Sequence, residues 1–204
     1  MANDCYNTII FRSNNKKYLL SFFNTINDLL LSDKRTYSDL FKAYGIDVIK
    51  YPQAYPDLSF KGFIIRCSDC IKYNESECEY YFSVESVTVL TPLTETIDLL
   101  LSKITGNLTY YILAEEPNTG LFINTDLTGF YFPFRYNLDF VYSDILSYND
   151  SFQTIEDCYV SIYSKMGWKY TNLKKAKARL KKLEKKLHSN NEDFILSINE
   201  FDVH

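Results

Sequence analysis

The stretch LTYYILAEEPNTGLFINTDLTGFYFPFRYNLD, residues 108–139, decides how the chain is expected to fold. Short apolar and aromatic runs alternate in it with clusters of turn-forming residues, which is typical of antiparallel strands. Gly120 and Gly129 lie in the turn clusters, where a positive φ costs glycine nothing. The pattern therefore predicts a three-stranded meander with strands at residues 108–114, 121–124 and 130–134.

The rest of the chain predicts further helices and strands around that meander. Apolar residues recur at spacings of three and four in four segments, and we expect helices at 16–31, 92–104, 154–165 and 172–188. Asn14, Pro92 and Asn172 are expected to begin three of them. We expect strands at 8–11, 63–66 and 79–90, a helical turn at 38–44, irregular chain at 46–62, and connections at 68–77 and 136–152. Residues 194–198 fit either an edge strand or a last helix.

This order of elements is typical of an α+β sandwich with helices on one face of an antiparallel sheet. We expect residues 1–150 to form that domain. Residues 151–204 are expected to form a helical extension with a basic amphipathic helix and a short tail.

Composition places the chain among globular proteins. Its 204 residues are 46% hydrophobic and 24% charged, which is sufficient for a core without disulfides. The aromatic share of 17% means that many rings must lie in the core or on a contact surface. No apolar run approaches the roughly 20 residues that span a bilayer, and the first residues do not resemble a signal peptide. We therefore expect a cytoplasmic protein with no membrane partner and with its five cysteines reduced.

Charge is concentrated in one segment. Residues 165–188 carry ten basic side chains and one acid, whereas the whole chain has a net charge of −4. The final helix within this segment also has an apolar seam with the spacing of a coiled coil, formed by Leu173, Ala176, Leu180, Leu183 and Leu187. Three roles remain open for it: docking on its own domain, a homodimer through Leu173, Leu180, Leu183 and Leu187, or nucleic-acid contact. The last would use Lys174, Lys175, Lys177, Lys181, Lys182 and Lys185.

Catalytic and metal-binding signatures are weak. Cys67 and Cys70 form a CxxC with Cys78 nearby, but structural zinc needs four ligands and both histidines are remote in sequence. Phosphate-binding glycine loops and nucleophile motifs are missing from the sequence. We therefore expect no cofactor, no metal and no enzymatic activity. A hydrolase using Glu116 or Asp126 is the remaining enzymatic alternative.

The opening MANDCYNTIIF resembles the YubB-like ferredoxin-fold proteins of plasmids and phages, which begin with a short Asn-Trp-Cys-x-Asn motif. Cys5 and Asn7 match that motif, whereas Asp4 stands where the family has Trp. The segment 87–92 and the Glu-Pro turn at 116–120 also resemble the family, so the likeness covers about residues 1–135. The resemblance implies a ferredoxin-like sandwich and a mobile-element origin, and it implies no reaction.

These observations predict a non-enzymatic phage or mobile-element protein in the cytoplasm of a host cell. We expect it to bind and inhibit a host defence protein, as an anti-CRISPR protein does. The contact surface is expected to be acidic and tyrosine-rich, formed by Glu115, Glu116, Asp126, Tyr110 and Tyr131. The alternative is an accessory protein that binds nucleic acid through the basic final helix.

Overall fold

The computed structural model describes residues 3–48, 59–142, 146–189 and 193–203. The chain folds as α+β and divides into two compact units, Met1–Thr125 and Asp126–His204, which we call the N-terminal and C-terminal units. The sequence-based boundary between residues 150 and 151 lies within a strand of the C-terminal unit. Most of the segment expected to be irregular, 46–62, lies outside the described residues.

An antiparallel sheet forms the framework of the N-terminal unit, and β1 lies at its centre. The strand order is β6-β5-β1-β4-β2, and β3 pairs with β4. The strands are β1 Asp4–Ser13, β2 Gly62–Cys67, β3 Lys72–Asn74, β4 Glu79–Val89, β5 Thr109–Glu116 and β6 Leu121–Asn124. All the expected strands of this unit are present, but β1 is longer than the 8–11 predicted, and the predicted connection at 68–77 contains β3.

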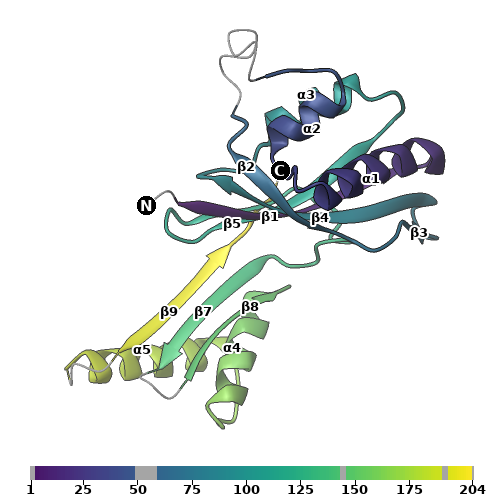
Figure 1. Cartoon of the computed structure of the whole chain (residues 1–204). Helices are drawn as coiled ribbons and strands as arrows, with labels where there is room; N and C mark the ends of the chain where they lie inside the picture. The colour runs from purple at the N-terminus through teal and green to yellow at the C-terminus, as the bar shows by residue number, and fades with distance from the viewer. Residues whose placement is uncertain (1–2, 49–58, 143–145, 190–192, 204) are drawn as a thin grey trace. The chain divides into compact units, whose positions relative to one another are not determined.

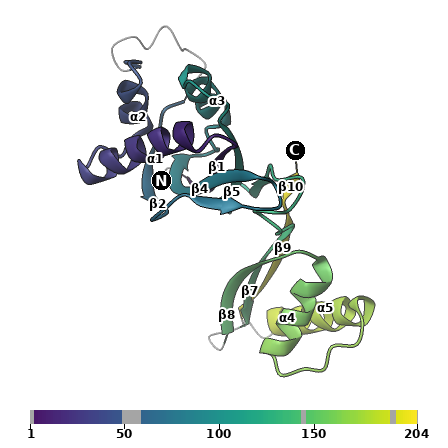
Figure 2. The same ribbon diagram turned by 90° about the vertical axis from the view of Figure 1, so that its right-hand side faces the viewer.

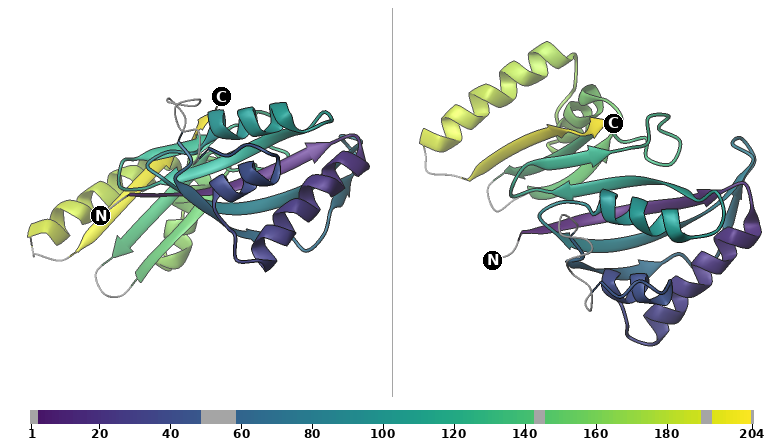
Figure 3. Two further views of the ribbon diagram at one scale, coloured as in Figure 1. Left: turned by 45° about the horizontal axis from the view of Figure 1, so that its top comes forward. Right: turned by 90° about the horizontal axis from the view of Figure 1, so that it is seen from above.

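Three helices lie over one face of this sheet (Figures 1 and 3). They are α1 Lys16–Leu31, α2 Tyr37–Ala43 and α3 Thr94–Lys103. The bounds of α1 agree with the prediction, but the helix is capped by Asn15 and not by Asn14. The Asn15 side chain accepts a hydrogen bond of 3.0 Å from the Lys17 N–H, which satisfies one of the amides left unpaired at a helix start.

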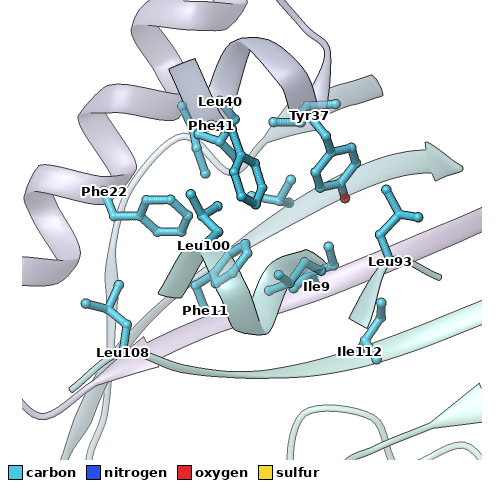
Figure 4. Packing of buried hydrophobic residues seen from close by; sticks show 14 of the residues in the cluster. Ile9, Phe11, Phe22, Tyr37, Leu40, Phe41, Leu93, Leu100, Leu108 and Ile112 are labelled. Atoms are coloured by element: carbon cyan, nitrogen blue, oxygen red, sulfur yellow. The ribbon is translucent and has the colours of Figure 1, made fainter. Parts of the chain in front are cut away.

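The core of the N-terminal unit fills the space between the helices and the sheet (Figure 4). Alternate residues of β1 point to this side, and Ile9 and Phe11 are both buried. The Phe11 ring meets the Phe22 ring of α1 edge to face, with centroids 4.8 Å apart. Phe82 of β4 is 5.5 Å from Phe11 by the same measure, so one aromatic group joins α1 to the two central strands.

The C-terminal unit has its own sheet and core and is more than the helical extension that was predicted. Its three-stranded sheet has the order β8-β7-β9, with α4 and α5 on one face (Figure 2). Its core includes Leu138 and Phe140 of β7, Ile162 of α4, Leu180 of α5 and Phe194 of β9. The elements are β7 Tyr136–Tyr142, β8 Leu146–Phe152, α4 Ile155–Lys165, α5 Leu173–Ser189, β9 Phe194–Glu200 and β10 Asp202–Val203.

The prediction of a third strand in the meander is wrong. Residues 130–134 do not form a strand, because the N–H groups of Tyr131 and Phe132 donate to the Asp126 carboxylate and not to a neighbouring strand. The predicted connection 136–152 is wrong too, since it holds the hairpin of β7 and β8. Residues 194–198, for which two alternatives were open, belong to strand β9.

Replacing Leu180 with Ala tests whether α5 is held by its own unit. We expect a loss of about 2–5 kcal/mol in the free energy of unfolding, because a fully buried leucine leaves a cavity. Trp168, the chain's one tryptophan, lies in the C-terminal unit, so urea unfolding followed by its fluorescence measures the change. The exposed Lys181→Ala is the control and should change stability by less than about 0.5 kcal/mol. An equal loss in both variants would contradict the docked arrangement.

Candidate nucleic-acid interface

The predicted acidic contact patch is not an exposed surface. Glu116 and Asp126 are both 0% exposed, and Glu115 is half-buried. Tyr110 lies on the helix-covered face of β5, where its hydroxyl donates to the Thr94 carbonyl at 3.2 Å. The expectation that Glu116 and Asp126 belong to an exposed contact surface is therefore wrong.

Asp126 organises the loop that follows β6. Its Oδ1 accepts hydrogen bonds from the N–H groups of Thr128 and Gly129, both at 3.1 Å. Its Oδ2 accepts from the N–H groups of Tyr131 and Phe132 at 2.7 and 2.9 Å. Burial alone raises the pKa of this carboxyl, but the Thr128 hydroxyl and the loop amides outweigh burial and lower its pKa. Asp126 thus has a structural role: its carboxylate accepts the hydrogen bonds of the loop N–H groups, and it fixes the position of Tyr131.

Glu116 has a comparable role in the turn between β5 and β6. Its side chain accepts a hydrogen bond from the Thr119 N–H, which holds the turn closed. A hydrogen bond from the Thr119 side chain makes the largest contribution to the lowered pKa of Glu116, and the Thr119 N–H lowers the pKa further. The carboxylate is therefore used within the hairpin.

The apolar seam of α5 is covered by the C-terminal unit itself. Leu180 and Leu187 are buried, and Leu173 and Leu183 are half-buried against the same core. Leu180 and Leu187 are consequently not available for a dimer interface, and the seam takes the docked role. Nucleic-acid contact through the opposite face of the helix is compatible with that role and stays a prediction. Asn172 caps the helix as predicted, with its Oδ1 accepting from the Lys175 N–H at 2.9 Å.

The basic residues of α5 all face away from that core. Arg179 and the predicted nucleic-acid contacts are exposed, namely Lys174, Lys175, Lys177, Lys181, Lys182 and Lys185. Spacings of four, three and four place Lys175, Arg179, Lys182 and Lys186 along one flank of the helix. We call these four residues the basic flank. They form a row of cations held by a docked helix.

An aromatic residue that the sequence did not single out lies beside the basic flank. The Arg179 guanidinium is 3.7 Å from the centroid of the Trp168 ring, a close cation–π contact. Gly167, at φ 66°, ends α4, and the Trp168 N–H then donates to the Tyr163 carbonyl at 2.8 Å. This reversal of the chain brings Trp168 back to the helices. The sequence signal was the lone Trp directly after a helix-ending glycine.

The cysteines offer no comparable site. Cys67, Cys70 and Cys78 are free thiols, and burial raises the pKa of Cys67 to about 11, so this sulfur is a protonated thiol at neutral pH. Within residues 3–48, 59–142, 146–189 and 193–203, no group of three potential metal ligands comes together. Cys67 is therefore held as a neutral thiol and is not primed as a nucleophile.

Comparison with known proteins gives this chain no relative: no family model, curated protein or solved structure matches it. Among the helices that the structure describes, none is both long enough and apolar enough to cross a membrane.

Replacing Asp126 with Asn should lower the free energy of unfolding by about 1.5–3 kcal/mol at neutral pH, because charge-assisted hydrogen bonds to the loop are lost. The folded-state pKa lies below the ordinary 3.8, so this stabilisation is present above the unfolded-state pKa and disappears as pH falls through the folded-state pKa. The difference between the two proteins should accordingly shrink below about pH 4. Urea unfolding across a pH series measures this difference, with the exposed Asp193→Asn as control. A constant difference down to pH 2 would refute the assignment.

Proposed function

We propose that the chain binds nucleic acid through the outward surface of α5. The observation that carries this proposal is the basic flank: four cations lie in a row on a helix whose apolar seam is already buried in its own unit. A helix of this kind needs no protein partner to bury its leucines, and its cations remain free to neutralise phosphates. The C-terminal unit has eleven basic and eleven acidic residues, so the basic surface results from segregation of charge and not from net charge.

Lysines supply this surface with affinity and not with sequence preference. Ammonium groups bind phosphates as point charges, whereas sequence is read at base edges by other side chains. We therefore propose an accessory protein that binds the phosphate backbone. It acts without catalysis, in the cytoplasm of the cell that carries the mobile element.

Substituting Gln for Lys175, Lys182 and Lys186 tests this function. We expect binding to a labelled oligonucleotide to weaken, and the slope of log K against log salt to become shallower by about 2, because about three phosphate contacts are lost. Fluorescence anisotropy between about 50 and 200 mM salt measures the slope. The matched control replaces three exposed lysines of the N-terminal unit, Lys17, Lys34 and Lys42, with Gln. Equal effects in both triple variants, or none in either, would rule out α5 as the binding surface.

We also propose that the N-terminal unit is ferredoxin-like and derives from a mobile element. The order β5-β1-β4-β2 supports this, because α1 and α2 follow β1, α3 joins β4 to β5, and every pair of neighbours is antiparallel. The resemblance of residues 1–135 to the YubB-like proteins points in the same direction.

Inhibition of a host defence protein is the second candidate function, and a specific feature of the N-terminal sheet favours it. On the face opposite the helices, Tyr6 and Glu115 are cross-strand partners and border a hollow of about 220 Å³. Tyr6 is 56% exposed, and Glu85 brings a second carboxylate to the same hollow. A basic, aromatic-binding segment of an effector fits such an acidic and apolar surface.

The double variant Tyr6→Ala and Glu115→Arg tests that candidate, because both side chains belong to the hollow. Phage plaques are counted on a host with an active defence system. Wild type should raise the count at least tenfold, and the variant should lose that effect. Glu77→Arg, a reversal at an exposed acid in the turn before β4, should retain it. A variant that protects phage as well as wild type would exclude the hollow.

A further inference from the structure

The residues beside the basic flank indicate which kind of nucleic acid the surface takes. We infer that it binds single-stranded nucleic acid, with one unpaired base stacked on Trp168 and neighbouring phosphates on the basic flank. This inference rests on the proposed function and adds the class of ligand to it.

Trp168 is held in place before any ligand arrives. Its ring meets the buried Tyr163 ring edge to face, with centroids 5.5 Å apart and an interplanar angle of 82°. Arg179 stacks at 3.7 Å from the Trp168 centroid and also lies 5.8 Å from the Tyr163 centroid. A ring fixed in this way loses little conformational entropy when a base stacks on it.

Tyr170 supports the same arrangement from the other end of the loop. Its ring packs edge to face on Tyr163 at 5.7 Å, and its hydroxyl donates to Glu156 of α4 at 2.6 Å. Both Trp168 and Tyr170 remain partly exposed, and the exposed Lys169 lies between them in the chain. The loop between α4 and α5 thus presents two rings and a cation next to the basic flank.

The combination of a fixed ring and a row of cations distinguishes single strands from duplexes. In a duplex the bases are stacked on each other, so a surface aromatic ring has no free base face to meet. In a single strand every base has an accessible π-face, and stacking on an aromatic side chain adds about 1–3 kcal/mol per base. The basic flank spans twelve residues of helix, roughly 16 Å from first to last, which is long enough for several phosphates of one strand.

The simpler role for Trp168 is to cover the Tyr163 end of the core. That role also places the ring against Arg179, but it predicts that ligand binding leaves the indole environment unchanged. The two roles can be separated because Trp168 is the chain's one tryptophan, and its fluorescence reports on this position alone.

The experiment titrates the full chain at low salt with oligo(dT), oligo(rU) and a DNA duplex of equal length. Binding is followed by anisotropy of the labelled strand and, in parallel, by Trp168 emission. We expect both single strands to quench the emission at the concentrations at which they bind. The duplex should bind at least tenfold more weakly and leave the emission unchanged. The ratio of oligo(dT) to oligo(rU) affinity then shows which sugar is preferred.

Three variants make the test independent of folding. Trp168→Ala should weaken oligo(dT) binding about 5- to 150-fold, which corresponds to loss of one stacked base. Trp168→Phe retains a stacking ring and should recover most of the affinity. Arg179→Lys retains the charge but loses the planar group. It should therefore reduce the quenching of Trp168 emission by a larger fraction than it reduces the slope of log K against log salt.

Each result decides the inference. Single-strand binding without quenching, unchanged by Trp168→Ala, would overturn the stacking site and leave backbone binding by the basic flank in place. Duplex binding as strong as single-strand binding would also overturn it. No binding of any of the three ligands would refute the proposed function together with this inference.

Discussion

Docking of the α5 leucines on the core that α4, β7 and β9 form is the contact on which the C-terminal unit depends. A helix with seven lysines and an arginine among its 17 residues is disfavoured in isolation, because like charges four residues apart repel and short helices are marginal in water. Burial of Ala176, Leu180 and Leu187 offsets that repulsion. Once the seam is buried, the 3.6-residue period leaves the lysines no orientation other than outward. The basic surface is therefore a consequence of the packing.

The N-terminal unit is ordered by a different means, a buried polar network on the helix-covered face. The Asn7 Nδ2 donates to the Thr88 hydroxyl and to the Cys5 carbonyl, both at 3.0 Å, and the Thr88 hydroxyl donates to the Thr91 carbonyl at 2.7 Å. This network links β1 to β4 and to the segment that leads into α3. Burial raises the pKa of Cys5 to about 11, so the thiol is uncharged at neutral pH. Asn7 and the neutral Cys5 thiol thus contribute to the buried contact between β1 and β4.

Periodicity in the sequence was enough to place most elements, including α1 and β6 with their observed bounds. It failed where a side chain, and not a neighbouring strand, accepts the backbone hydrogen bonds. The hydrophobic pattern of residues 130–134 does not reveal that the Asp126 carboxylate accepts hydrogen bonds from their N–H groups. The β7–β8 hairpin was missed because its outer positions are Asn, Asp and Ser, residues that usually mark loops. The same bias led us to expect Glu116 and Asp126 in solvent. Trp168 was overlooked because its importance depends on Arg179, which only the fold brings near.

The net charge of −4 is a poor guide to what such a chain binds. At physiological ionic strength, exposed charges interact over a Debye length of about 8 Å, so a phosphate on α5 experiences mainly the charges of that helix and its immediate neighbours. Within α5 the one acid is Glu184, which is half-buried on the core side of the helix. Glu156 of α4 is held by the Tyr170 hydroxyl. The acids elsewhere in the chain lower the long-range attraction and hence the association rate. Under the proposed function, the basic flank supplies the short-range contacts that decide affinity.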